Sequence, residues 1–222
     1  MPGGEWSDPQ APDGAPVKVA PFLIGRTEVT WDMYDAFALS APDSADRRGS
    51  DAVARPTRPY GAPDYGWGHA GFPVISVART AADAFCEWLS RRTGKKYRLP
   101  TEVEWAYVAH LAAGGRSPSP NELDTLAWHA GNSGGRTHSV ATRGSDALGL
   151  YDLFGNAAEW VMNSEGRPVV RGGSFRDPLT AVGPRARAVQ DDRWNERDPQ
   201  IPQSRWWLSD GPFVGFRLVR EP

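Results

Sequence analysis

The segment GLYDLFGNAAEW, residues 149–160, decides the fold. It places Asp152 seven residues before Glu159, with a Gly-Asn pair at 155–156 between them. Glycine lets the backbone turn in ways that other residues avoid, and the apolar residues after Glu159 continue naturally as a core strand. The two carboxylates can therefore belong to a metal-binding loop, to an acid/base pair, or to a turn that only starts a buried strand.

Length and charge limit the possible classes of protein. The chain has 222 residues and a formal net charge of −2, so we expect a single domain over 1–222 and no nucleic-acid partner. No apolar run approaches the ~20 residues of a spanning helix. Residues 1–16 are polar and show no signal peptide. We expect a soluble protein, and the sequence leaves its compartment open.

Helical periodicity appears in the first half of the chain. Thr30 is a plausible N-cap for a short helix that carries Met33, Tyr34 and Phe37 on one face. A longer helix is predicted from a Thr80 cap to a stop at Gly94.

A Pro break at 100 precedes another helical segment, where Thr101 and Glu104 fit a capping box. Short strands are predicted within 17–30 and at Tyr97–Leu99, then as a hairpin within 160–175, and finally within 213–220. Residues 114–148 read as mostly loop. The pattern predicts an α+β domain with two main helices and much irregular surface.

Four blocks, in this order, resemble one known family: RTEVTWDMYDAF (26–37), YRLPTEVEWAYVA (97–109), GLYDLFGNAAEWV (149–161), and VVRGGSF with GFRLVR (169–175 and 215–220). They are similar to the formylglycine-generating-enzyme, or sulfatase-modifying factor, domain family over roughly residues 17–220. The resemblance implies a variant of the C-type lectin fold, with two helices, small twisted sheets and long loops. The family is functionally mixed: it contains copper-dependent oxidases, iron-dependent sulfoxide synthases, and domains used for binding. The fold alone therefore does not give the activity.

The copper oxidases hold their metal through two cysteines, which by resemblance would fall near Leu179 and Pro184. Soft Cu(I) requires thiolates, and the single cysteine of the chain, Cys86, stands elsewhere, where we expect it to be a small buried hydrophobe. We therefore expect no copper and no formylglycine-generating activity.

The iron-dependent relatives use an HxxxHxE motif that this chain lacks. His129 and His138 flank a glycine-rich loop and could meet at a metal with a carboxylate, but ordinary loop histidines are the simpler interpretation. We expect no iron.

In family members with metal sites, the opening segment binds a structural calcium. Carried over by resemblance, Asp152 and Glu159 would supply side-chain oxygens, and Gly155 and Ala157 would supply carbonyls. Calcium prefers such hard oxygen ligands. The family's other calcium site, near Asn132, looks lost. The alternative is that the two carboxylates accept hydrogen bonds from backbone and arginine donors without a metal.

The segment DDRWNERDPQIPQSRWWLSD, residues 191–210, combines the residue types that anchor interfaces. It suggests a site for a protein or small-ligand partner, built from Arg193, Trp194, Arg205, Trp206 and Trp207. Alternatively, the tryptophans fix a long loop onto the core.

Other residues in the blocks favour structural roles. Glu102 and Glu104 are expected to cap a helix and to pair with Arg98 or Arg171. Arg171 with the glycines at 172–173 is expected to form a tight buried turn, and the segment 215–217 to fix the last strand. The function we expect is a non-catalytic binding or accessory module with one structural calcium. The alternatives are an iron-dependent oxidoreductase and, against the missing cysteines, a formylglycine-generating oxidase.

Overall fold

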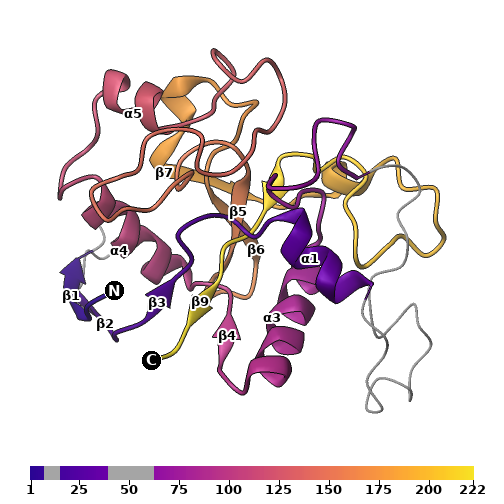
Figure 1. Ribbon diagram of the computed structural model, residues 1–222, viewed down its shortest axis with the longest axis horizontal. Coiled ribbons are helices and arrows are strands. Elements are labelled where there is room, and N and C mark those ends of the chain that lie inside the picture. Colours follow the sequence, from indigo (N-terminus) through magenta and orange to yellow (C-terminus); the bar gives the residue numbers. More distant parts are fainter. Residues whose placement is uncertain (8–15, 40–62) are drawn as a thin grey trace.

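The computed structural model describes residues 1–7, 16–39 and 63–222. In these ranges four α-helices and nine strands occur, which confirms the α+β class with small sheets and long loops (Figure 1). The helices are α1 (Trp31–Ala38), α3 (Arg79–Thr93), α4 (Glu102–Ala112) and α5 (Pro120–Leu126). The strands are β1 (Gly4–Ser7), β2 (Pro16–Val19), β3 (Leu23–Ile24), β4 (Tyr97–Arg98), β5 (Ala158–Met162), β6 (Pro168–Gly172), β7 (Gly183–Val189), β8 (Val214–Gly215) and β9 (Val219–Arg220).

The strands form three small sheets. β1 pairs with β2, β9 lies between β3 and β4, and the largest sheet has the order β7-β6-β5-β8. Within that sheet β5 runs antiparallel to β6 and parallel to β8, so the opening segment leads directly into a central strand. Figure 1 shows this sheet behind the loops of the middle of the chain, with α1 and α3 on one side of the molecule and α4 on the other.

Both faces of the central sheet are covered, which explains why β5 is buried over residues 158–161 and apolar except at Glu159. Neighbouring residues of a strand point to opposite faces. Trp160 accordingly joins a hydrophobic cluster with α1 and α3, whereas Val161 joins a second cluster with α4. The turn of residues 149–157 lies at the end of this strand and is held between the two clusters.

The helix boundaries follow the sequence signals only in part. The capping box of Thr101 and Glu104 is present at the start of α4, and Gly94 ends α3 in the left-handed conformation at φ 67°. However, α3 begins two residues earlier than expected, after Ala78, and the Thr80 hydroxyl donates instead to the Arg205 carbonyl. Thr80 therefore ties the helix to the segment 191–210 rather than capping it.

Two further details of the helices differ from the expectation. In α1, Tyr34 and Phe37 are buried but Met33 is 50 % exposed, because Trp31 takes the inward position. In the range expected to be mostly loop, residues 120–126 form α5 behind a capping box of Ser119 and Glu122.

Candidate functional site

The turn of the opening segment is built by backbone conformations that few residues tolerate. Asp152, Gly155 and Asn156 all have positive φ, at 54°, 78° and 52°. At Gly155 a Cβ atom would lie 2.3 Å from the Trp128 carbonyl oxygen, so the space itself requires glycine. The turn is therefore fixed by close contact with the segment after α5, not only by its own sequence.

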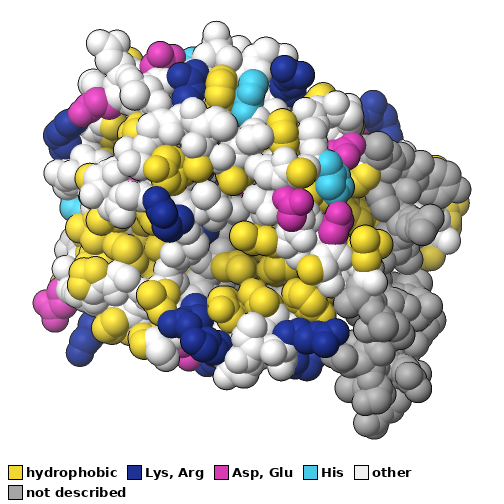
Figure 2. Space-filling view, viewed as in Figure 1, with side chains coloured by type: hydrophobic (Ala, Val, Ile, Leu, Met, Phe, Trp, Pro, Cys, Tyr) yellow, Lys and Arg dark blue, Asp and Glu magenta, His cyan; other side chains and the backbone are white. Residues whose placement is uncertain are grey.

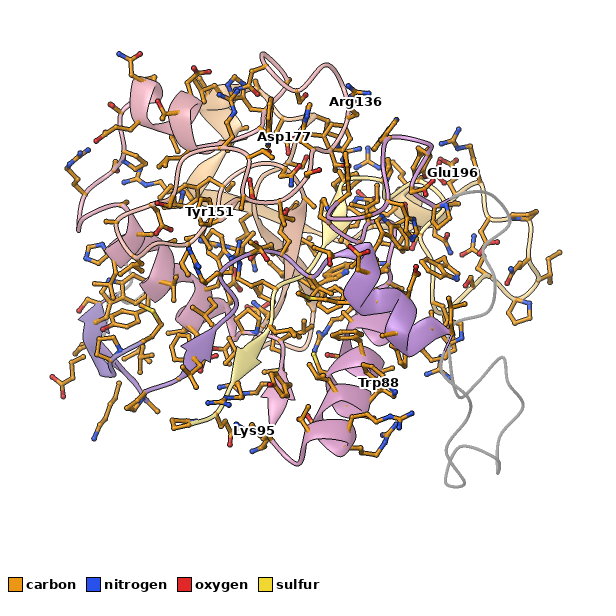
Figure 3. The ribbon with its side chains drawn as sticks, viewed as in Figure 1. Trp88, Lys95, Arg136, Tyr151, Asp177 and Glu196 are labelled. Carbon is orange, nitrogen blue, oxygen red and sulfur yellow. The ribbon has the colours of Figure 1, made fainter. Side chains whose placement is uncertain are left out.

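Glu159 lies at the centre of a buried ionic network. Its Oε1 accepts hydrogen bonds from the Arg217 Nε and Nη2 at 2.9 and 2.8 Å, and its Oε2 accepts one from the Trp105 indole at 2.9 Å. Arg217 also donates to the carbonyls of Gly25 and Tyr151, each at 2.8 Å; Tyr151 is labelled in Figure 3. Both charged side chains are at most 1 % exposed. The pair therefore connects the turn, β5, the N-terminal segment and the last strands.

Asp152 differs from Glu159 because only one of its two carboxylate oxygens has a hydrogen-bond partner. Its Oδ2 accepts a hydrogen bond from the Ala141 amide at 2.7 Å, whereas its buried Oδ1 has no partner among the described residues. Burial raises the pKa of Asp152 to about 6, against the opposing effects of the Ala141 amide and Arg217. An unpaired carboxylate oxygen in this environment favours either a proton or a cation.

A third carboxylate, that of Glu28, belongs to the same cluster. The pattern of the sequence did not predict its place there. Glu28 is 1 % exposed and accepts hydrogen bonds from the Ala157 amide and the Asn156 side chain, each at 2.8 Å. Burial, and then the neighbouring charges of Asp152 and Glu159, raise the pKa of Glu28 well above its usual range. Glu28 is 129 residues from Ala157 in the sequence, so only the fold brings them together.

The four residues expected at calcium thus lie in one turn and the strand that follows it. Their two carboxylates are not equally suited to bind a cation. The unpaired Oδ1 of Asp152 fits a cation ligand. Glu159 fits poorly, because the Arg217 guanidinium already balances its charge. Within the described ranges, no group of three or more His, Cys, Asp or Glu side chains is arranged to hold a metal ion.

The two histidines considered for iron are engaged separately. His129 shares a hydrogen bond with the Asp124 carboxylate at 2.8 Å and accepts the Gly131 amide at 3.1 Å. His138 bonds to the Ser133 carbonyl at 2.7 Å and stacks on Trp128 at 3.7 Å between ring centroids. Both histidines therefore fix the loop of residues 127–143.

The positions given to the copper cysteines have packing and backbone roles. Leu179, in the short 3-10 helix at 179–181, packs against the hydrophobic cluster of α4, and the Pro184 carbonyl accepts a hydrogen bond from Arg171. Cys86 is buried in α3, and burial raises the pKa of its thiol. The sulfur is therefore neither exposed nor in its reactive thiolate form.

In the segment 191–210, burial separates the aromatic from the charged residues. Trp194, Trp206 and Trp207 are 8 %, 3 % and 8 % exposed and belong to the core cluster of α1 and α3. Arg193 and Arg205 are exposed. The tryptophans therefore hold the segment onto the core, and the surface it presents carries the two arginines.

The charged residues of the second and fourth blocks form the ion pairs expected of them. Glu104 forms two bonds of 2.7 Å with Arg98, and Glu102 pairs with Arg171 and Arg187. The glycines at 172–173 form the tight buried turn, with φ of 91° and 75°. The chain is thus a small-sheet α+β domain, in which the Glu159–Arg217 pair holds the turn of residues 149–157.

Comparison with known proteins identifies the family. The model of the "Sulfatase-modifying factor enzyme 1-like domain" family matches residues 2–222, so the chain belongs to this family. The chain is 28 % identical over 214 residues to the formylglycine-generating enzyme of Streptomyces coelicolor, covering 72 % of this chain and 66 % of that protein. It is also 34 % identical over 97 residues to the serine/threonine-protein kinase Pkn1 of Chlamydia trachomatis serovar L2, covering 43 % of this chain but only 14 % of the kinase.

The fold has a close counterpart among solved structures. PvdO from Pseudomonas aeruginosa superposes with a TM-score of 0.68 at 25 % identity, covering 100 % of this chain and 93 % of that one. In the described ranges, no helix is both long and apolar enough to cross a bilayer. On the face drawn in Figure 2, charged side chains of both signs are interspersed with apolar patches.

Proposed function

We propose that this chain is a non-catalytic binding or accessory module of the sulfatase-modifying factor family. The observation that carries the proposal is the number and the position of the cysteines in the chain. A two-thiolate copper site needs two cysteines, and the single Cys86 is buried in α3, away from the positions held by Leu179 and Pro184. The short match within a much longer kinase supports the proposal that such domains serve as parts of larger proteins.

A titration with Cu(I) tests this proposal. The purified chain is titrated anaerobically with Cu(I) in competition with a chromogenic chelator, beside a Cys86→Ser variant. We expect the chelator to retain the metal and the two proteins to behave alike. Stoichiometric removal of Cu(I) from the chelator by the wild-type chain would overturn the non-catalytic proposal.

The surface we propose for the partner is the exposed part of the segment 191–210. Arg193 and Arg205 are two of its exposed charged groups, beside Asp192, Glu196 and Arg197, and the buried tryptophans give it a fixed shape. We expect Arg193→Gln with Arg205→Gln to leave the thermal melt unchanged and to weaken partner binding, whereas Trp207→Ala lowers the melt. A melt that is equally lowered by the arginine substitutions would assign the whole segment to stability instead.

A structural calcium at the turn stays a prediction. The unpaired buried oxygen of Asp152 supports it, and the pairing of Glu159 with Arg217 opposes it. Removal of calcium with a chelator should lower the melting temperature of the wild-type chain but not that of Asp152→Asn. An unmoved wild-type melt, with no calcium in the purified protein, would leave the two carboxylates with a purely structural role.

A further inference from the structure

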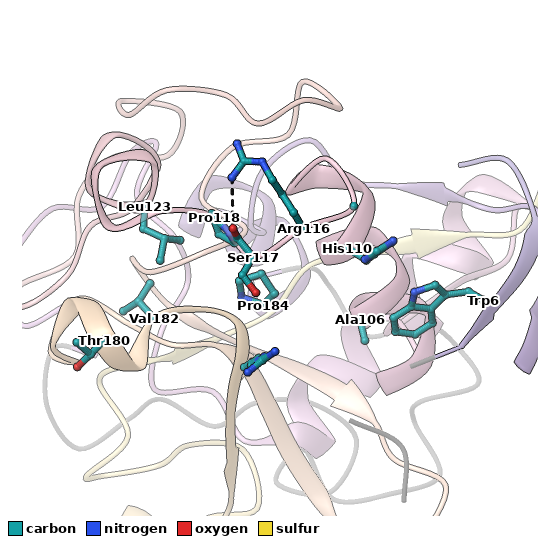
Figure 4. A pocket seen from close by; sticks show the side chains of 12 residues that line it. Trp6, Ala106, His110, Arg116, Ser117, Pro118, Leu123, Thr180, Val182 and Pro184 are labelled. Carbon is teal, nitrogen blue, oxygen red and sulfur yellow. Dashed lines mark hydrogen bonds between the residues drawn. The ribbon is translucent and has the colours of Figure 1, made fainter. Parts of the chain in front are cut away.

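A cavity of about 410 Å³ lies between α4, the segment 115–118, α5 and β7. Figure 4 shows Trp6, Ala106 and His110 on one side of it and Leu123 and Val182 on the other. Its volume falls in the range of small-molecule sites. The cavity is separate from the segment 191–210, so an argument about it is independent of the proposed partner surface.

The side chains of this cavity that carry nitrogen bases are a histidine and two arginines. They are His110, Arg116 and Arg185, and none of the lining residues is Asp or Glu. Arg116 is already bound to the Glu122 carboxylate, at 2.9 Å from its Nη1, and to the Ser117 carbonyl. The cation that remains for a ligand is therefore Arg185.

The contrast between Arg185 and its neighbour on β7 shows that the charge of Arg185 is not balanced within the protein. The pairing of β7 with β6 is irregular between Gly183 and Arg187, so Arg185 lies outside the regular ladder. Arg187, two residues on, bonds to the Glu102 carboxylate at 2.7 Å. Arg185 is exposed and has no hydrogen bond or ion pair among the described residues. An unbalanced guanidinium at the border of a cavity without carboxylates favours an anion there.

The rest of the lining is apolar and aromatic. Trp6 is 9 % exposed, and the His110 ring lies against it at 5.9 Å between centroids. Ala106, Leu123 and Val182 complete a surface that an apolar group can cover. A small polar ion alone would leave this surface in contact with water, whereas a ligand with an apolar body would bury it.

We propose that this cavity binds a small amphipathic organic anion, a carboxylate or phosphate monoester with an aromatic or apolar body. The anionic group bonds to Arg185, with His110 near it. The apolar body lies against Trp6 and the aliphatic side chains opposite. The bidentate geometry of guanidinium suits both carboxylate and phosphate.

The test uses benzoate, phenyl phosphate and the neutral analogue benzamide as probes of the full chain. Binding is followed by the amide and indole N–H signals of the ¹⁵N-labelled protein, in which the Trp6 indole is identified by its loss in Trp6→Phe. We expect benzoate or phenyl phosphate to shift the Trp6 indole signal saturably, and benzamide to bind at least tenfold more weakly, about the effect of one charge-assisted hydrogen bond. The two anions compared with each other distinguish a carboxylate site from a phosphate site.

Variants test the assignment to Arg185. Arg185→Gln should raise the dissociation constant about tenfold or more. The matched control is Arg136→Gln, which removes the same charge from a loop that does not line the cavity (Figure 3). Equal affinity of wild type and Arg185→Gln, equal binding of benzamide and benzoate, or no saturable shift up to about 10 mM of either anion would overturn the proposal. Since the spectra also report the fold of each variant, a misfolded protein is recognised directly.

Discussion

Replacing Arg217 by methionine tests the buried ion pair that locks the turn to the sheet. The guanidinium is fully buried, pairs with Glu159, and donates to the carbonyls of Gly25 and Tyr151. Methionine keeps much of the apolar volume but removes all these donors. Removing one partner of a buried pair costs about 3–5 kcal/mol, because it leaves the other charge uncompensated. We therefore expect the free energy of unfolding to fall by about 4 kcal/mol.

Urea unfolding followed by tryptophan fluorescence measures this loss. With a slope of about 3 kcal/mol per molar, at the upper end for small proteins, the midpoint should fall by about 1.3 M. The control Arg193→Met removes an exposed guanidinium, 82 % accessible, which pairs with Asp191, and should change the midpoint by less than about 0.2 M. Adding Glu159→Gln to Arg217→Met should recover part of the loss. A midpoint of Arg217→Met within about 0.3 M of wild type would refute the central place given to this pair.

Two further predictions concern the turn and the surface. Gly155→Ala should destabilise the chain by more than about 2 kcal/mol in urea unfolding, since its Cβ would meet a carbonyl, whereas Gly134→Ala, also at positive φ but in open space, should cost about 1 kcal/mol; similar costs would contradict the steric argument. Hydrogen bonding to Asp35, and then to Asp64, against partial burial, raises the pKa of His69. The stabilisation by His69 should therefore be complete below its unfolded pKa of about 6.5 and disappear as the pH rises through the folded value. A difference in stability between wild type and His69→Gln that is constant from acid to alkaline pH would refute this assignment.

The elements with local signals were predictable from the sequence. The capping box of Thr101 and Glu104, the stop at Gly94 and the hairpin within 160–175 each depend on residues close to one another in the chain. The helix α5 carried the same kind of signal in Ser119 and Glu122, with proline at its first position. The prediction missed it because the helix has only seven residues and lies within a long segment rich in loop-forming residues.

The contents of the site were less predictable, because they depend on distant segments. Glu28 joins the carboxylate cluster only because the first block and the turn at 149–157 meet in the fold. Arg217 neutralises Glu159 across 58 residues of sequence. A carboxylate with a calcium-type spacing in the sequence can thus be an ion-pair partner in the structure.

Burial likewise decided the role of the tryptophans in the segment 191–210. Their residue type fits an interface and a core equally well, since both bury large aromatic surfaces. Only the packing of Trp194, Trp206 and Trp207 against α1 and α3 separates the two. Arg193 and Arg205 beside them belong to the exposed polar surface of that segment.

The most direct test of the non-catalytic account combines metal analysis with oxygen consumption. The purified chain, as isolated and after incubation with copper, is analysed by mass spectrometry for copper and iron and placed in an oxygen electrode with a cysteine-containing peptide and a thiol reductant. The account predicts no stoichiometric copper or iron and no oxygen uptake above that of the buffer with the same metal. About one copper or iron per chain, with oxygen uptake that depends on the protein, would contradict it.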